Sequence, residues 1–508
     1  MMNEQFDVLI IGGGATGLGV AVEAATRGYK TILFEAYDFG TGTSYKSTKL
    51  VHGGIRYLAN FDFALVREGL AERFHFLNNA PHIAHAQGYL VPFYSIWDKL
   101  KYFLGINLYD FLAGNKKLGS SKFLNHDEVL QLAPDLNATG LRGGAIYYDG
   151  QFDDTRMLVT LLRTFQEHGG IAYNYHQITD FIKDADFKVI GVNILDKLNN
   201  KQFSVNAKVV INATGTLTDT ILDIDEPSAK HNNVAAAQGT HLVFDKDIFA
   251  SDYALVIPKT PDERILFVLP WHDKVLVGTT DIAIEKAEID PVASQDEIDF
   301  ILDTLNQYTV KKVSRADIRS IFAGQRPLVR PANVSNTAKI SRKHEILYSQ
   351  SGIISIVGGK WTIYRLMGED TIDFAIDKHL LLSRKSKTRN LHLFGYTHNQ
   401  LVYPLSVYGS EADKVLQIQK ETGNFDKLHP DLPYYTAEII YQTRHEMVKT
   451  VEDVLARRTR AVFLNAVAAK ECAVSVAKLM ADELGHDENW AINQIQEFNQ
   501  IVKRYIIT

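Results

Sequence analysis

The stretch FDVLIIGGGATG (residues 6–17) decides the fold class of this chain. Residues 6–11 are a short apolar run suited to a central parallel strand, and Gly12, Gly14 and Gly17 follow with the spacing G-x-G-x-x-G. Gly12 permits a tight turn, Gly14 lets a pyrophosphate reach backbone N–H groups, and Gly17 lets the next helix pack closely on the strand. The stretch therefore predicts a dinucleotide-binding turn at the start of a helix.

A second strand and an acidic residue complete this motif. The small residues of LGVAVEAATRG suit a helix packed on a sheet, KTILF (residues 30–34) suits a second strand, and Glu35 ends that strand. Glu35 stands 18 positions after Gly17, close to the spacing of about 20 expected for a ribose-binding carboxylate. An acid here favours a free ribose 2′-hydroxyl, which indicates FAD or NAD rather than NADP.

Two later strand ends favour FAD over NAD. Residues 207–215 (AKVVINATG) resemble a buried strand that ends in a small-residue turn, although any strand-to-loop exit has this pattern. Residues 353–365 (IISIVGGKWTIYR) give a strand, a glycine pair and a helix start, whose backbone amides can face a flavin ring. We therefore expect FAD, held by the glycine turn and Glu35 together with Ala213, Thr214, Gly215, Gly359, Lys360, Trp361 and Thr362.

Composition excludes several classes of protein. The chain has 508 residues and a net charge of −6, so no global basic field indicates nucleic acid. Its single cysteine excludes an internal disulfide and a Cys-x-x-Cys site, and we expect no metal. The N-terminus lacks a cationic leader, and no apolar run reaches about 18 residues, so we expect a cytoplasmic protein without a spanning helix.

Residues 97–112 (WDKLKYFLGINLYDFL) have apolar side chains at helical spacing. A buried amphipathic helix is the simpler interpretation, and contact with a membrane surface is the alternative.

The expected fold class is α/β, with three parts. A Rossmann-like FAD-binding part of the glutathione-reductase/D-amino-acid-oxidase type covers about 1–80, 145–220 and 345–385. A β-rich substrate-binding part covers about 85–140 and 221–344, where short β segments are frequent. These parts form one oxidoreductase unit, 1–385. Glycines then become fewer and helical patterns dominate, so we expect an α-helical C-terminal cap domain at 390–508.

The segment TGTSYKSTKLVHGGIRYL (residues 41–58) follows the ribose acid and should run along the dinucleotide toward the flavin. Its hydroxyls can donate to the cofactor, or they are ordinary loop hydroxyls; they belong to Thr43, Ser44, Ser47 and Thr48. His52 alone would more often be a structural histidine. Its position beside Gly53-Gly54 and a flavin favours a functional role.

Four cations on separate segments are the strongest indication of the substrate. Arg56, Arg326, Arg342 and Lys360 would each be typical of a solvated surface if taken alone. Arg56 and Lys360 lie on loops already assigned to the flavin side. Convergence of all four would create an anion pocket that matches a phosphate dianion.

Several longer signatures together resemble the FAD-dependent glycerol-3-phosphate dehydrogenases. They are STKLVHGGIRYL (47–58), LPWHDKVLVGTTD (269–281), GQRPLV (324–329), IVGGKWTIYR (356–365) and RHEMVKTVEDVLARRTRA (444–461). The resemblance covers residues 6 to about 480. It implies oxidation of sn-glycerol 3-phosphate to dihydroxyacetone phosphate in glycerol and glycerophospholipid metabolism, with electrons passed to membrane quinone. It also implies peripheral attachment to the inner face of the cell membrane and a helical C-terminal cap.

The resemblance also implies an active site. Its catalytic residues would be His52 and Arg326, its substrate-binding residues Arg56, Tyr57, Arg342, Lys360 and Thr280, and its wall Thr279 and Asp281. The expected reaction is hydride transfer from substrate C2 to flavin N5, with His52 as the base, since its ordinary pKa of about 6.5 lies near working pH. Arg326 would polarise the developing carbonyl, or it would hold the phosphate. Ile55, Gln325 and Trp361 depart from the pattern without removing a charge.

Three alternatives remain open at this point. An α-glycerophosphate oxidase would use oxygen, but its mid-chain insertion has no obvious counterpart here. An amine or amino-acid oxidase of the same superfamily would need an anion site for only one carboxylate. A non-catalytic FAD-bearing module would use residues 390–508 for docking. The sequence does not decide the oligomeric state, for which a homodimer is one candidate.

Overall fold

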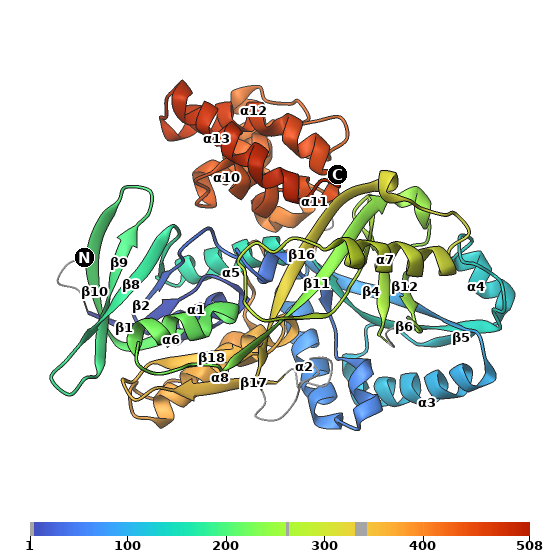
Figure 1. The fold of residues 1–508 in the computed structure, drawn as a ribbon, viewed down its shortest axis with the longest axis horizontal. Helices are drawn as coiled ribbons and strands as arrows, with labels where there is room; N and C mark the ends of the chain where they lie inside the picture. The colour runs from blue at the N-terminus through green and yellow to red at the C-terminus, as the bar shows by residue number, and fades with distance from the viewer. Residues whose placement is uncertain (1–4, 261–263, 331–342, 400, 508) are drawn as a thin grey trace.

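The computed structural model describes residues 5–260, 264–330, 343–399 and 401–507. Two β-sheets stand side by side, and a layer of C-terminal helices covers one end of both (Figure 1). This arrangement confirms the expected α/β class with a helical C-terminal domain. The boundary at residue 390 stays a prediction.

The first sheet contains the predicted dinucleotide motif. Its strand order is β17-β18-β10-β1-β2-β7, and β1 pairs in parallel with both β10 and β2. The strands are β1 (Gln5–Ile11), β2 (Thr31–Phe34), β7 (Ile171–Tyr173), β8 (His176–Lys183), β9 (Val189–Asp196), β10 (Lys201–Asn212), β17 (His344–Tyr348) and β18 (Ile354–Gly358). Strands β8 and β9 extend the sheet from β10 in antiparallel pairing.

Successive side chains of β1 are buried on alternate faces of this sheet. Val8 and Ile10 pack against helices α1 (Ala15–Thr26), α5 (Asp154–Glu167) and α8 (Tyr364–Asp377). Leu9 and Ile11 pack against the β8–β9 hairpin on the other face. Such two-sided burial explains the continuous apolar sequence of the strand.

The second sheet is mixed and larger. Its strand order is β15-β11-β14-β13-β12-β4-β6-β3, with β16 on β11 and β5 on β6. The strands are β3 (Leu50–Val51), β4 (Ala84–Phe93), β5 (Lys122–Leu124), β6 (Gly143–Phe152), β11 (Val234–Asp245), β12 (Ala254–Ile257), β13 (Leu266–Trp271), β14 (Lys274–Gly278), β15 (Ile282–Ile284) and β16 (Ile318–Val329). Helices α4 (His126–Leu132) and α7 (Gln295–Tyr308) cover one face.

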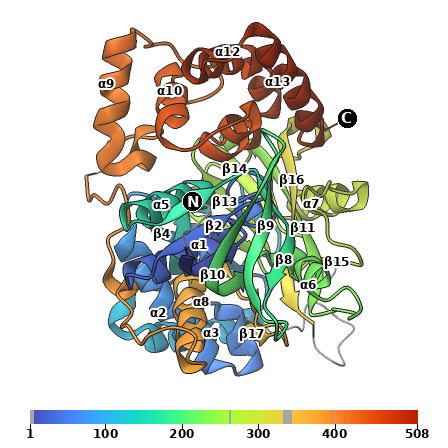
Figure 2. The same cartoon turned by 90° about the vertical axis from the view of Figure 1, so that its left-hand side faces the viewer.

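The other face of the second sheet packs against helices from both ends of the chain. Side chains of α2 (Phe63–Asn79) and α3 (Ile96–Ala113) share one core with the sheet and with the C-terminal helices other than the first. The C-terminal helices are α9 (Ala412–Thr422), α10 (Thr436–His445), a π-helical turn (Asp453–Arg458), α11 (Ala461–Leu464), α12 (Ala466–Leu484) and α13 (Glu488–Ile501). Figure 2 shows α9, α10, α12 and α13 at the end of the molecule opposite α3. Helix α6 (Thr218–Asp225) follows β10.

Helix α3 forms where the sequence predicts a helix, but the buried interpretation is wrong. Trp97 is 75% exposed, Leu104 62% and Phe111 79%, and three more large apolar side chains of this helix are at least 47% exposed: Ile96, Leu100 and Phe103. Only Ile106, Tyr109 and Ala113 of α3 are buried. Its apolar stripe therefore faces solvent at the lower edge of Figure 1. Within the described residues, no helix is both long enough and apolar enough to cross a membrane.

Candidate active site

A cavity of about 940 Å³ lies between the two sheets. Its wall combines the glycine turn after β1, the end of β2, the turn after β10, and the loop after β18 with residues of β11, β13 and β16. The segments that the sequence analysis assigned to a dinucleotide therefore converge in the structure.

The glycine turn has no room for side chains. Gly12 has φ +105°, and a Cβ there would lie 2.7 Å from the carbonyl oxygen of Ala213. A Cβ on Gly17 would lie 1.9 Å from the carbonyl oxygen of Gly12, so Gly17 serves helix packing. Gly14 precedes α1 and lines the cavity. N–H groups at the start of a helix are the donors that a pyrophosphate needs, so this cradle fits FAD.

Glu35 closes one end of the cavity. Its Oε2 accepts a hydrogen bond from the N–H of Gly13 at 2.6 Å, and its Oε1 accepts one from the N–H of Tyr37 at 2.9 Å. Burial raises the pKa of this carboxyl to about 7, although the two N–H groups oppose the rise. A ribose with free hydroxyls would supply further donors to the carboxylate, as its position after β2 predicts.

The four hydroxyl residues of the next segment all line the cavity and also bind protein groups. Thr43 donates to the carbonyl of Gln325, and Ser44 Oγ accepts from the N–H of Ala15 at 3.0 Å. The hydroxyl of Ser47 donates to Asp154 at 2.7 Å. Thr48 Oγ1 lies 2.9 Å from His241 Nε2. These bonds tie the segment to the glycine turn, to α5 and to the second sheet. Direct bonds from these hydroxyls to FAD stay a prediction.

The glycine pair of HGGIR places His52 at the cavity wall. Gly54 has φ +83°, and a Cβ on Gly53 would lie 2.5 Å from the Tyr109 hydroxyl, so close packing requires both glycines. His52 is half-buried and lines the cavity, and its backbone N–H donates to Thr362 Oγ1 at 3.2 Å. Thr362 itself is buried, so this hydrogen bond fixes the backbone of His52.

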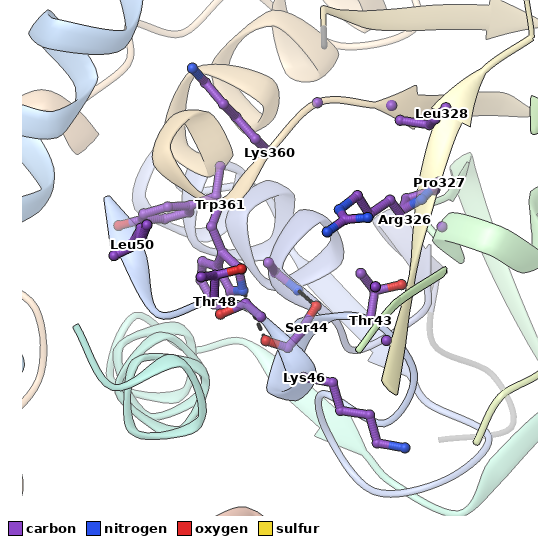
Figure 3. Close-up of a pocket in the computed structure, with 18 of the residues that line it drawn as sticks. Thr43, Ser44, Lys46, Thr48, Leu50, Arg326, Pro327, Leu328, Lys360 and Trp361 are labelled. Carbon is purple, nitrogen blue, oxygen red and sulfur yellow. Dashed lines mark hydrogen bonds between the residues drawn. The ribbon is translucent and has the colours of Figure 1, made fainter. Parts of the chain in front are cut away.

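Two of the four predicted cations line the cavity from separate segments (Figure 3). Arg326 on β16 donates to Thr279 Oγ1 at 3.1 Å and to Asp281 Oδ1 at 3.3 Å. The Lys360 ammonium lies 5.2 Å from the ring centre of Tyr57, which also lines the cavity. All of Arg342 and the side chain of Arg56 lie outside the described residues.

Thr280 lines the cavity, but its hydroxyl faces the protein. It donates to Glu297 Oε1 at 2.6 Å and accepts from the N–H of Thr240 at 2.8 Å. Both partners are buried, so this hydroxyl anchors the loop that presents Thr279 and Asp281 to Arg326. Binding of substrate by Thr280 stays a prediction.

The two later turns pack closely around the cavity. Gly215 has φ +60°, and a Cβ on Gly359 would lie 2.4 Å from the Met367 sulfur. Both glycines, with Ala213 and Thr214, line the cavity. The indole N–H of Trp361 donates to the carbonyl of Ser44 at 2.9 Å, which joins the loop after β18 to the hydroxyl segment.

Sequence reasoning missed several polar residues of the wall, among them Lys46, His241 and Arg264. His241 is 2% exposed and stacks on Phe322 with ring centres 4.8 Å apart. Burial, reinforced by nearby cations, holds its pKa well below the ordinary value, so the ring is neutral at physiological pH. A lone histidine in an apolar strand is typical of a core residue, so no local pattern distinguishes it.

This arrangement combines a dinucleotide cradle with a cationic wall. One end offers backbone donors and a carboxylate, as FAD requires, while Arg326, Lys360 and His52 supply cations and a proton acceptor. The residues present therefore fit FAD together with a small anionic substrate.

Comparisons with known proteins agree with this geometry. Residues 7–365 match the family model "FAD dependent oxidoreductase", and residues 354–491 match "C-terminal domain of alpha-glycerophosphate oxidase". A probable mitochondrial glycerol-3-phosphate dehydrogenase of Caenorhabditis elegans is 39% identical over 95% of this chain and 71% of the relative. One from Dictyostelium discoideum is 38% identical over 94% of this chain and 81% of the relative.

Solved structures give the same result. The glycerol-3-phosphate dehydrogenase from Bacillus halodurans, complexed with FAD, superimposes with a TM-score of 0.81 at 28% identity, covering 100% of this chain and 96% of that one. The L-alpha-glycerophosphate oxidase from Mycoplasma pneumoniae has a TM-score of 0.61 at 16% identity, covering 78% of this chain and 100% of that one, which shows a shared fold. The chain therefore belongs to the FAD-dependent oxidoreductase family and, within it, to the FAD-dependent glycerol-3-phosphate dehydrogenases.

Proposed function

We propose that this protein oxidises sn-glycerol 3-phosphate at C2 to dihydroxyacetone phosphate, as part of glycerol and glycerophospholipid metabolism. The observation that carries the proposal is that His52, Arg326 and Lys360, from three separate segments, all lie in the wall of the FAD cavity. A phosphate dianion suits this cationic wall better than a single carboxylate does.

Each side chain has a distinct role in the proposed reaction. FAD, when bound, supplies the acceptor for the hydride that leaves substrate C2. His52 accepts the proton of the C2 hydroxyl, for which a half-buried imidazole is suited. Arg326, oriented by Thr279 and Asp281, polarises the oxygen as it becomes a carbonyl. Lys360 holds the phosphate together with Arg56 and Arg342.

Anaerobic reduction of the bound flavin by a panel of compounds tests the substrate. Glycerol 3-phosphate should bleach the flavin absorbance, whereas glycerol should not, because it lacks the anion that the cations bind. Bleaching by glycine or sarcosine would instead assign an amino-acid oxidase. If no compound of the panel reduces the flavin, the result would favour a non-catalytic FAD-bearing module.

We further propose that a membrane quinone takes the electrons from the reduced enzyme. Residues of helix α3 and apolar side chains near it belong to the cavity wall and are called here the apolar lobe: Ile55, Leu104, Leu108, Val256 and Phe267. Leu104 belongs both to this lobe and to the exposed stripe of α3. An apolar acceptor dissolved in lipid would therefore enter the cavity beside this stripe. Oxygen, the acceptor of an oxidase, would need no such lobe.

The same helix supports peripheral attachment to the cytoplasmic face of a membrane. Its six exposed apolar side chains form one stripe, since their positions repeat at helical spacing. Lys99, Lys101, Lys116 and Lys117 stand on and just after α3 and suit an anionic lipid surface. A stripe of this kind inserts to the depth of the headgroups without spanning the bilayer.

Replacement of two stripe residues tests the attachment. Trp97→Ser with Phe111→Ser should weaken binding to anionic lipid vesicles by about 10- to 100-fold, because each side chain loses part of the ~1.5–3 kcal/mol of full apolar burial. Reduction of a water-soluble dye should stay normal, and reduction of a long-chain quinone in vesicles should fall. Val474→Ser, a 61% exposed residue of α12 at the opposite end, is the control. Equal vesicle binding by both variants would refute the assignment.

A further inference from the structure

Residues 36–50, called here the flavin-facing segment, connect β2 to β3 and have two very different sides. Ten of these residues line the cavity: Ala36, Tyr37, Thr41, Gly42, Thr43, Ser44, Lys46, Ser47, Thr48 and Leu50. Regular structure within the segment is limited to one 3₁₀ turn, Ser44–Lys46, and the start of the two-residue strand β3. Apart from a few backbone hydrogen bonds, such as the one from the N–H of Gly40 to the carbonyl of Gly13 at 3.0 Å, side-chain contacts fix its conformation.

The first of these contacts is a buried ion cluster at Asp38. Arg457 Nε donates to Asp38 Oδ2 at 2.7 Å, while Arg458 donates to both carboxylate oxygens at 2.8 and 2.9 Å. Burial alone would raise the pKa of Asp38, but the two guanidinium groups overcome this effect and hold it at about 2. Both arginines lie in the π-helical turn of the C-terminal domain and are 2% exposed.

A second contact fixes the middle of the segment. Arg460 Nη2 donates to the carbonyl of Tyr45 at 3.0 Å and lies 3.3 Å from Asp154 Oδ1. The other oxygen of Asp154 accepts from both the N–H (3.1 Å) and the hydroxyl (2.7 Å) of Ser47. Lys49 Nζ donates to this carboxylate and, at 3.0 Å, to the Tyr45 carbonyl. Arg460 thereby completes a buried network that sets the turn preceding His52.

Tyr45 adds a ring contact and a hydrogen bond with the same domain. Its ring meets that of Phe463 edge-on with centres 5.7 Å apart, and its hydroxyl lies 3.2 Å from that of Tyr505. Among the described residues, none after Met367 lines the cavity. The described part of the C-terminal domain therefore contacts the flavin-facing segment without itself contributing to the cavity wall.

We propose that Arg457, Arg458 and Arg460 are positioning residues for FAD, which hold the flavin-facing segment in its binding conformation from outside the cavity wall. FAD affinity and the docking of the C-terminal domain are then coupled, and the coupling is reciprocal, because FAD must stabilise the arginine contacts as much as they stabilise FAD binding. The inference rests on FAD occupying the cavity and is independent of which substrate is oxidised.

The first experiment measures FAD affinity in the absence of substrate. Arg460→Met removes the bonds to Tyr45 and Asp154, while Lys49 still neutralises Asp154, so the variant should fold. Its FAD dissociation constant, from flavin fluorescence on dilution of the holoprotein, should rise about 10- to 100-fold. Arg460→Lys, which keeps the charge, should recover part of the loss. Arg444→Met is the control, since Arg444 pairs with Glu483 on the surface of the same domain.

The second experiment uses the unaltered protein and tests reciprocity. FAD should slow amide hydrogen exchange in residues 446–464, although the described residues of this stretch contribute nothing to the cavity wall. In Arg460→Met this protection should shrink, while α12 and α13 exchange as before.

Two results would overturn the inference. One is an Arg460→Met protein that folds and binds FAD within twofold of the unaltered chain. The other is unaltered protein in which FAD does not change amide hydrogen exchange in residues 446–464. If Arg460→Met fails to fold, the exchange experiment on the unaltered protein tests the inference by itself. Normal FAD affinity and normal coupling with no oxidation of glycerol 3-phosphate would instead contradict the proposed function.

Discussion

Glu35 gives the sharpest test of how this protein binds FAD. Its carboxyl is buried at one end of the cavity, and burial raises its pKa from 4.5 to about 7. Ribose hydroxyls that donate to the carboxylate favour its charged form and should return the pKa toward 4.5 in the complex. Binding of FAD below pH 7 should therefore expel a proton, and Glu35→Gln should abolish this release.

The sign and size of the effect follow from these pKa values. The free protein binds the proton more tightly than the complex does, so FAD affinity should rise with pH up to about 7 and then level off. One pKa unit corresponds to a factor of ten, so a full return from about 7 to 4.5 would change the affinity by roughly 300-fold. The Glu35→Gln variant should bind FAD about 10- to 150-fold more weakly above pH 7, the range for one lost charged hydrogen bond.

Dilution of the holoprotein between pH 5 and 8, with released FAD followed by fluorescence, measures both quantities. Glu438→Gln is a matched control, because burial also raises the pKa of Glu438 to about 7 but this residue lies in α10, away from the cavity. The control should keep the pH dependence of the unaltered chain. The reasoning fails if Glu35→Gln keeps the same pH dependence, since another group would then bind the proton.

Three predictions concern substrate binding and the chemical step. His52→Ala should lower the rate of flavin reduction at saturating glycerol 3-phosphate by about 10²–10⁴-fold; an unchanged rate and pH profile from pH 5 to 9 in rapid mixing would make His52 structural. Arg56→Ala should mainly raise KM, lowering kcat/KM about 10- to 150-fold, because a non-reacting phosphate is bound alike in ground and transition states. Arg326→Gln should mainly lower kcat in steady-state assays if Arg326 polarises the carbonyl; a change confined to KM would assign it to the phosphate.

The glycine turn and the position of Glu35 beside it could be predicted because their signals are local. The spacing of Gly12, Gly14 and Gly17 reflects steric needs within one strand–turn–helix unit, and the structure shows the corresponding close contacts. Glu35 follows from the same unit, since β2 must end beside the turn. Such features need no knowledge of the rest of the fold.

The exposure of the apolar face of α3 could not be predicted, because it depends on neighbouring elements and not on the local sequence. Apolar residues at helical spacing show that a helix has an apolar stripe, but what covers that stripe depends on neighbouring elements. Here the second sheet and α2 contact Ile106, Tyr109 and Ala113, which lie on another side of the helix. The expected stripe, with Trp97 and Phe111, consequently stays in solvent.

Arginine shows most clearly where local sequence stops being informative. Arg326 lies in GQRPLV and Arg458 in LARRTR, and both are arginines among mixed neighbours. The side chain of Arg326 is 26% exposed and lines the cavity, whereas that of Arg458 is 1% exposed, with its donors directed at Asp38 and the carbonyl of Glu446. Asp38 precedes Arg458 by 420 residues, so no short motif can report this pair. A guanidinium directed at buried partners can position the site but cannot bind a substrate, while one at a cavity wall can do so. The burial of each guanidinium and the identity of its partners therefore distinguish the two roles. Both properties depend on the fold and cannot be read from the local sequence.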